Sequence, residues 1–263
     1  MGEVFMFNTL FRQRIGIPKN EEITFKKLDY ILEKAATTIP FENLGVMRTQ
    51  STEINKENML DKVLIRNEGG LCYELNTTLY FFLVENGFNV NLIRGVVYND
   101  PAQECGTIWR THVAILLIHD DETYLVDTGF GGNLPLKPVP LTGEMVTSNN
   151  GEFLVKKENS DFGDYILKVK LKHKDLDWRI GYAFDSKQPV SDVSELNEVQ
   201  KIITAHPKSL FNKHPLITKI TTTGSVTLTD TSFTQWIDGE MIKEKIDFEK
   251  FNQLLSHYFE RTF

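Results

Sequence analysis

The spacing of the apolar residues changes near Gly87, and this change constrains the fold more than any other feature of the sequence. Before Gly87, apolar residues recur three and four positions apart, as on the buried face of a helix. After it, segments with strand-like patterning follow one another, at 88–92, 112–118, 165–171 and 178–184. Short strands that follow a helical region predict an α+β chain, in which the strands form a sandwich or a barrel.

Three helices are predicted in the first third of the chain. The first carries its apolar stripe at 25–35, and the second holds the apolar residues at 59–64. The third runs over 72–86, and Gly87 follows it at the position of a left-handed C-cap. The first third is therefore expected to be a helical bundle.

The last part of the sequence mixes both patterns. Strands are predicted at 217–221, 225–229 and 233–237, with polar turns between them. A final helix is predicted over 248–259, with Asp247 as its N-cap.

The chain is expected to form three parts with boundaries near residues 90 and 195. Residues 1–90 are mainly helical, residues 91–195 are mainly strands, and residues 196–263 contain both. The sequence has no internal repeat, low-complexity tract or long linker, so the three parts are expected to pack as one unit.

Composition excludes several classes of protein. The chain has 263 residues, of which 41% are hydrophobic, and this is enough for a well-buried core. Its 29 basic and 36 acidic residues give a net charge of −7, which argues against nucleic acid or an anionic membrane as a partner. No apolar run approaches the roughly 20 residues that span a bilayer, and the N-terminal segment lacks the order of a signal peptide. A cytoplasmic protein is therefore expected.

The two cysteines, Cys72 and Cys105, are both expected to be reduced thiols. Disulfides are rare in the cytosol, and two cysteines are too few for a thiolate zinc site. No metal is predicted.

The segment RNEGGLCYELN, residues 66–76, places Cys72 in the first turn of a predicted helix. Gly69 and Gly70 let the chain turn sharply before it. The free N–H groups and the positive end of a helix favour a thiolate, which is the nucleophilic form of cysteine, and can stabilise an oxyanion. A free cysteine is more often a small buried hydrophobe, so the position alone does not establish a nucleophile.

A nucleophile needs a base, and THVAILLIHDDETYLVDTGFG offers one. If this segment is a hairpin whose tip lies between His119 and Asp120, His112 lies directly across from Asp127. If the tip lies between Asp120 and Asp121, the two are diagonal neighbours on the same face. A one-residue slip would separate them, so their pairing depends on the register. Taken alone, His112 is as readily a core histidine and Asp127 a turn residue.

The sequence resembles the arylamine N-acetyltransferases along essentially its whole length. The matching motifs are IPFENL at 39–44, the GG-x-C-x-E-x-N core at 69–76, RTH at 110–112, VDTGFGG at 126–132, and KSLFNKHPLITKI followed by GSVTLTD at 208–230. The family's catalytic triad falls on Cys72, His112 and Asp127.

The resemblance implies a helical bundle that carries the cysteine, a β-barrel that carries the histidine and aspartate, and an α/β lid, with a cysteine-protease-like triad. It implies acetyl transfer from acetyl-coenzyme A to aromatic amines or hydrazines through a cysteine thioester. It places coenzyme A near Thr111, His112 and Ser209, and the amine near Phe41 and Phe130. The oligomeric state stays open between a monomer and a homodimer.

The sequence departs from the family pattern at Glu68. Many members have a basic residue immediately before Gly-Gly, and it pairs with the glutamate of PFENL, which is Glu42 here. Arg66 or Arg48 is expected to take over this ion pair.

Two other classes of function stay open. Thiol hydrolases and transglutaminase-like enzymes use the same Cys-His-Asp set without coenzyme A. A non-catalytic relative that acts as a binding protein is favoured only by Glu68. Release of coenzyme A thiol, with and without an aromatic amine, separates these classes from an acetyltransferase.

Overall fold

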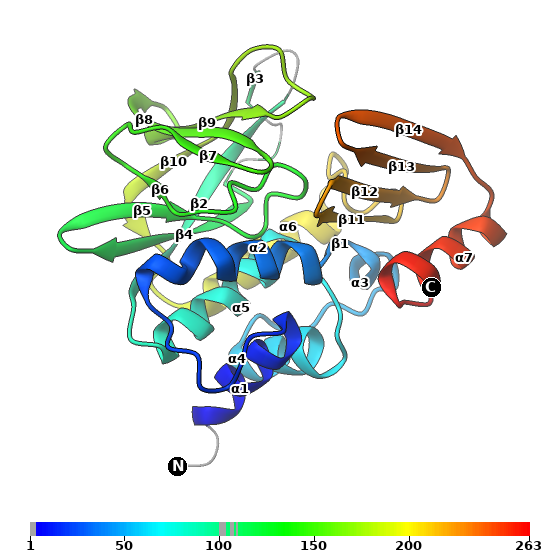
Figure 1. Cartoon of the computed structure of the whole chain (residues 1–263), viewed down its shortest axis with the longest axis horizontal. Helices are drawn as coiled ribbons and strands as arrows, with labels where there is room; N and C mark the ends of the chain where they lie inside the picture. The colour runs from blue at the N-terminus through cyan, green and yellow to red at the C-terminus, as the bar shows by residue number, and fades with distance from the viewer. Residues whose placement is uncertain (1–3, 100–103, 106–107, 109) are drawn as a thin grey trace.

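A computed structural model describes residues 4–99, 104–105, 108 and 110–263 of the chain (Figure 1). In these ranges the helices are α1 (Val4–Ile15), α2 (Leu28–Thr38), α3 (Leu44–Met47), α4 (Lys56–Met59), α5 (Cys72–Glu85), α6 (Leu196–Ala205) and α7 (Phe248–Phe259). A π-helix (Leu60–Ile65) continues α4, and 3₁₀ turns at Phe25–Lys27 and Val193–Glu195 precede α2 and α6.

Two sheets complete the fold. The larger contains β2 (Asn89–Asn99), β3 (Glu104–Cys105), β4 (His112–His119), β5 (Glu122–Val126), β6 (Val139–Pro140), β7 (Val146–Ser148), β8 (Gly151–Ser160), β9 (Gly163–Leu171) and β10 (Arg179–Pro189). The smaller contains β1 (Phe41–Glu42), β11 (Leu216–Thr221), β12 (Gly224–Thr229), β13 (Ser232–Ile237) and β14 (Glu240–Lys245). Figure 1 shows α2 and α5 beneath the larger sheet and α7 beside the smaller one.

The helical region agrees with the predicted pattern in most places. The first predicted helix begins later, at Leu28, because a 3₁₀ turn precedes it, and it ends at Thr38 because Ile39 is extended before Pro40. The second is split into α4 and the π-helix. The third, α5, was predicted correctly, and it is buried on most sides. Helix α1 was not predicted, although its Phe7, Phe11 and Ile15 are buried in the same core.

The larger sheet has the strand order β6-β5-β4-β2-β10-β9-β8-β7, and β3 pairs with β2 at its side. It curls into a barrel-like form, so that β6 contacts β8 near the other end. The prediction of a mixed helix and strand chain with a barrel-like sheet is therefore confirmed. The boundaries at residues 90 and 195 stay a prediction.

The hairpin of β4 and β5 fixes the pairing on which the sequence argument depended. His119 pairs with Glu122, and the two-residue turn consists of Asp120 and Asp121 at φ +49° and +64°. Two aspartates tolerate this left-handed geometry, which suits the twist of a hairpin. The tip therefore lies between Asp120 and Asp121, the second of the two registers considered, and Asp127 follows directly after β5.

The smaller sheet links distant parts of the chain. Its strand β1 pairs with β11, with Phe41 opposite Thr218. The three predicted strands in this region are present, and α7 begins as predicted, with Asp247 accepting a hydrogen bond from Lys250 N at 2.9 Å. The smaller sheet and α7 share a core with Leu44 of α3.

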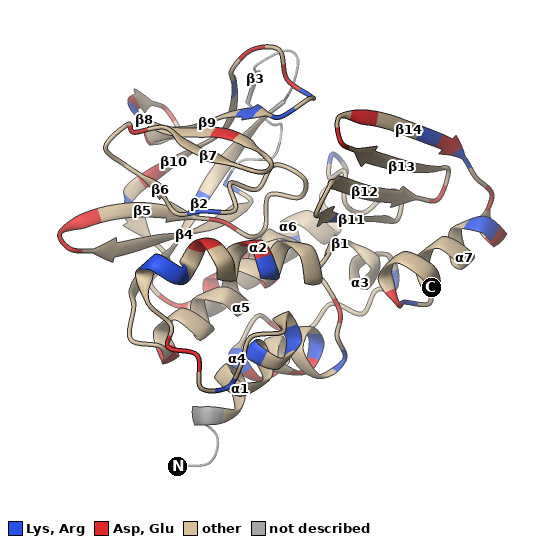
Figure 2. Cartoon of the chain, viewed as in Figure 1, with Lys and Arg blue, Asp and Glu red and all other residues tan. Residues whose placement is uncertain are grey.

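Two further findings concern the surface. No helix in the described ranges is long and apolar enough to cross a membrane. Acidic and basic segments lie interspersed over the visible ribbon (Figure 2).

Candidate functional site

Cys72 is the first residue of α5, and Leu71 before it is extended. The two glycines that precede it allow a close approach of backbone segments. A Cβ on Gly69 would lie 2.1 Å from Pro40 O, and one on Gly70 would lie 2.8 Å from the Glu74 side chain. Because only glycine fits, the turn delivers Cys72 to the helix start with its thiol free and 6% exposed.

Glu74 supports this helix start. Its Oε2 accepts a hydrogen bond from Leu71 N at 2.9 Å, and its Oε1 lies 2.5 Å from Lys62 Nζ. Both side chains are buried. Burial lowers the pKa of Lys62, but the carboxylates of Glu74 and Glu42 outweigh it, so the pKa is raised overall.

His112 and Asp127 meet as the diagonal register predicts. His112 Nε2 lies 2.7 Å from Asp127 Oδ2, and both side chains are almost fully buried. Cys72 contributes to the raised pKa of the imidazole, so its side chain lies close to the ring, and Asp127 leaves the second ring nitrogen for it. The Cys72 thiol also donates to Thr111 O at 3.4 Å. The structure thus brings the three predicted triad residues together.

The charge states of this pair support each other. Burial opposes the imidazolium, yet the charge and hydrogen bond of Asp127, with a further contribution from Cys72, raise the pKa of His112 to about 10. Burial likewise opposes the Asp127 carboxylate, but His112, Asn76 and the Gly129 N–H lower its pKa. At neutral pH the site therefore holds an imidazolium against a carboxylate.

Asp127 accepts four hydrogen bonds, two of them from residues that the sequence argument did not place there. Asn76 Nδ2 donates to Oδ1 at 2.9 Å, and Tyr182 OH donates to Oδ2 at 2.9 Å. Gly129 N completes the Oδ1 side at 2.7 Å. Tyr182 was predicted only as part of the strand-like segment 178–184, because nothing in the sequence reports a contact across 55 positions.

Asn76 also ties α5 to the sheet. Its amide donates to Val113 O at 2.7 Å, and its carbonyl accepts from Thr128 N at 3.0 Å. Gly129 lets the two layers approach, because a Cβ there would lie 2.6 Å from the Cα of Cys72. The distance between the thiol and the imidazole is therefore set by a close contact of backbones.

A cavity of about 520 Å³ opens onto the thiol. Its walls contain the other site residues that the family resemblance implied: Phe41, Thr111, Phe130 and Ser209. The ring of Phe130 lies 5.0 Å from that of His112, and the ring of Phe41 packs edge-on against Phe211 at 5.6 Å. Ser209 is buried, and its Oγ accepts from Phe211 N at 3.3 Å, which leaves its hydroxyl hydrogen for another acceptor.

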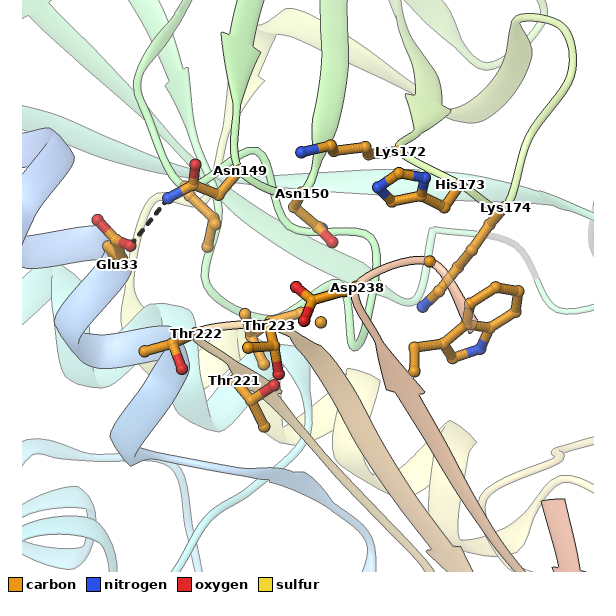
Figure 3. Close-up of a pocket in the computed structure, with 15 residues that line it drawn as sticks. Glu33, Asn149, Asn150, Lys172, His173, Lys174, Thr221, Thr222, Thr223 and Asp238 are labelled. Atoms are coloured by element: carbon orange, nitrogen blue, oxygen red, sulfur yellow. Dashed lines mark hydrogen bonds between the residues drawn. The ribbon is translucent and has the colours of Figure 1, made fainter. Parts of the chain in front are cut away.

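A second cavity, of about 160 Å³, lies between the smaller sheet and the loops of the larger one (Figure 3). Glu33 and Asn149 close one side with a hydrogen bond of 3.3 Å, and Lys172 and His173 lie across from Thr223. It shares Lys174 and Trp236 with the larger cavity but contains none of the triad residues.

Two further expectations concern cysteine and metal chemistry. The side chain of Cys105 lies outside the described residues. Within the described ranges, no group of three or more His, Cys, Asp and Glu side chains is arranged to hold a metal ion.

The ion pair of Glu42 differs from the expectation. Neither Arg66 nor Arg48 takes the place of the family's basic residue. Arg66 pairs with Asp61 and Glu68, and it is Arg261 that lies 3.8 Å from the Glu42 carboxylate. The prediction was wrong because the partner comes from a segment near the other end of the sequence.

A thiol at a helix start, held beside an imidazole and a carboxylate at the end of an apolar cavity, is an arrangement typical of cysteine-dependent enzymes. The comparison with known proteins is more specific. A family model described as N-acetyltransferase matches residues 24–262, and the chain belongs to the arylamine N-acetyltransferase family. It is thus an acetyltransferase.

Individual relatives agree with this assignment. An uncharacterized acetyltransferase of Bacillus subtilis, YvcN, is 41% identical, and the match covers 94% of this chain and 95% of YvcN. The arylamine N-acetyltransferase (BACCR)NAT3 of Bacillus cereus is 40% identical over the full length of both chains, with a TM-score of 0.92. That enzyme is described as having a unique Cys-His-Glu triad, whereas in this chain the carboxylate on His112 is Asp127. The Mycobacterium marinum enzyme in complex with coenzyme A shares the fold, with 22% identity, coverage of 96% and 91%, and a TM-score of 0.83.

Proposed function

We propose that this chain transfers an acetyl group from acetyl-coenzyme A to the nitrogen of an aromatic amine or hydrazine, by way of a thioester on Cys72. The convergence of Cys72, His112 and Asp127 at the end of one cavity carries the proposal. Membership of the family supports the reaction, and the coenzyme A complex of the distant relative supports the donor.

The first half-reaction uses the imidazolium of His112 and the thiolate form of Cys72, which is the nucleophilic form. The Cys72 thiolate attacks the carbonyl carbon of the donor, and a new S–C bond forms as the bond to the coenzyme A sulfur breaks. The imidazolium of His112 gives its proton to the departing thiolate. Asp127 holds the ring in the required orientation throughout and does not itself take the proton.

The second half-reaction reverses these roles. Once Cys72 is acetylated, its contribution to the raised pKa of His112 is lost, which lowers that pKa and makes the neutral ring more available as a base. The amine nitrogen attacks the thioester carbonyl, His112 accepts the amine proton, and Cys72 leaves as a thiolate. N–H groups at the start of α5 stabilise the oxyanion in both steps.

The cavity provides for both substrates. Phe41 and Phe130 supply apolar walls for the aromatic ring of the amine. Thr111 and Ser209 are assigned to the donor, and two lysines in the same wall, at 174 and 208, supply positive charge for its phosphates. Residues 196–263 act as a lid, since many of the lining residues come from this part. No metal takes part, and the reaction belongs in the cytoplasm, where Cys72 stays reduced.

The test is the covalent intermediate. Intact mass is measured after mixing with acetyl-coenzyme A alone, and one added acetyl group is expected on Cys72, with release of one coenzyme A thiol. Addition of an aromatic amine should remove this acetyl group and yield the N-acetyl amine. Cys72→Ser serves as the control. Steady release of acetate without an amine would instead indicate a hydrolase, and absence of thiol release would indicate a binding protein.

A further inference from the structure

The turn before Cys72 rests on a cluster of charged side chains. We call these residues the turn cluster: Glu42, Lys62, Glu68, Glu74 and Arg261. All five are buried or mostly buried, with side chains no more than 16% exposed. Charges in such a place persist only when they are paired.

Glu42 is the member that touches the turn. Its Oε1 accepts a hydrogen bond from Gly69 N at 3.0 Å, and its Oε2 accepts from Leu44 N at 2.8 Å. The backbone around it is equally tight, with Glu42 N donating to Gly70 O at 2.9 Å. A shift of this carboxylate therefore moves the turn that sets the position of Cys72.

Arg261 is an ion-pair partner of Glu42, and Lys62 adds a second positive charge nearby. Arg261 Nη2 lies 3.8 Å from Glu42 Oε1 and 3.3 Å from Glu68 Oε1. One guanidinium therefore pairs with both carboxylates and offsets their mutual repulsion. Lys62 is engaged by Glu74 at 2.5 Å on the other side of the turn. The single positive charge of Lys62 therefore cannot balance the negative charges of the three carboxylates in the turn cluster.

The segment that carries Arg261 packs against α7 and Arg48. Arg261 N donates to Leu255 O at 3.3 Å, and the ring of Phe263 packs edge-on against Phe251 at 5.5 Å. Arg48 holds the carbonyl of Thr262 and lies 5.2 Å from the ring of Phe263. The guanidinium is therefore delivered to a fixed place beneath the turn.

We propose that Arg261 is a positioning residue for the nucleophile: it holds Glu42, Glu42 holds Gly69, and the turn then places Cys72. This inference rests on the proposed function only for its rate readout. It assigns to residue 261 the part that the basic residue before Gly-Gly plays in many family members, while Glu68 occupies that position here.

The experiment moves the charge between the two positions. Arg261→Gln should slow both the acetylation of Cys72 and its alkylation by iodoacetamide, each by about tenfold, since small misplacements of a reacting group reduce rates this much or more. Glu68→Arg alone should also slow both reactions, because it sets a second cation beside Arg261. The double variant Glu68→Arg/Arg261→Gln should recover to within about threefold of the parent chain, because the guanidinium introduced at position 68 then reaches Glu42.

Arg66→Gln is the matched control, since Arg66 also pairs with Glu68 but is 41% exposed and makes no ion pair with Glu42. It should leave both rates nearly unchanged. Equal rates for Arg261→Gln and Arg66→Gln would overturn the proposal, and so would a double variant no faster than Arg261→Gln. If Arg261→Gln does not fold, the double variant decides: recovery supports the proposal and failure refutes it.

Alkylation needs neither coenzyme A nor an amine, so it separates this proposal from the proposed function. If no variant is acetylated but the alkylation rates follow the expected order, positioning by Arg261 stands and the acetyl-transfer proposal falls.

Discussion

Replacement of Asp127 by asparagine tests the centre of the site. The donors Gly129 N–H and Asn76 NH₂ both face Oδ1, so the new amide must keep its oxygen on that side. Its NH₂ group then faces His112 Nε2 and the Tyr182 hydroxyl. His112 Nε2 has to become an acceptor, and the ring proton moves to the nitrogen that faces the thiol.

This change of tautomer removes the base. The nitrogen beside Cys72 then carries a proton and has no lone pair with which to accept another. The imidazolium is also lost: the pKa of His112 is about 10, against 6.5 for an ordinary imidazole, and this difference corresponds to about 5 kcal/mol, with Asp127 as the largest favourable contributor.

The expected loss of acetyl-transfer activity is at least about 100-fold, or near 3 kcal/mol of barrier, and extends to a few thousand-fold if the whole stabilisation is lost. In a serine triad the analogous exchange lowers turnover by roughly 10⁴-fold. The loss is expected to be smaller here because a cysteine is more acidic than a serine. Stability should fall by about 1–3 kcal/mol, the cost of a mismatched buried polar group.

The assay is acetylation of an aromatic amine, measured together with thermal melting. Asp164→Asn is the matched control, since Asp164 is also a buried carboxylate and holds Ser186 through two hydrogen bonds away from the thiol. Asp127→Glu keeps the charge and should retain more activity than Asp127→Asn. A well-folded Asp127→Asn protein with most of its activity would refute the triad, and Asp127 would then be a turn residue only.

Two further outcomes are expected. Because the pKa of His112 is raised in the folded chain, the stability that its protonation contributes is complete below about pH 6.5 and is lost as the pH rises through about 10. The difference in melting temperature between the parent chain and His112→Gln should therefore shrink over this pH range. A constant difference would contradict this prediction. Gly129→Ala should lose about 1–3 kcal/mol of stability and most of its activity, because its Cβ would lie 2.6 Å from the Cα of Cys72. Gly132→Ala, whose Cβ meets nothing within 4 Å, should melt like the parent chain, and equal melting curves for the two variants would count against a tight helix–sheet contact.

Local patterns predicted the elements that position the triad. Helix α5 and the β4–β5 hairpin follow from periodicity and from the residues at their ends, since both are decided within short stretches of sequence. The pairing of His112 with Asp127 depended only on which two residues form the tip of the hairpin. The tip is formed by Asp120 and Asp121, which both have positive φ.

Other elements were missed or only partly predicted, for different reasons. All residues of β14 are exposed, so its sequence shows no alternation of buried and exposed positions. The π-helix at Leu60–Ile65 keeps a helical apolar pattern while its hydrogen bonds change. Helix α1 does have a helical stripe, but its N-terminal segment was considered only as a possible signal peptide.

Contacts between distant segments decided the rest of the site. Tyr182 reaches Asp127 across 55 positions, and Arg261 reaches Glu42 from the other end of the chain. Each is an ordinary residue in its local sequence, and only the packing of the helices against the two sheets gives it a role.

The pairing of Glu42 with Arg261 has a consequence for how the protein is made. At ribosomal rates of about 5–20 residues per second, roughly 10–45 s pass between synthesis of the carboxylate and synthesis of its cation. From the synthesis of Asp127 to the end of that interval, a nascent chain has all three triad residues but lacks the guanidinium beneath the turn. Incomplete products that stop before residue 261, such as those released by premature termination, are therefore expected to carry a misplaced Cys72 thiol. The thiol is expected to become fully reactive only after residue 261 has been synthesised.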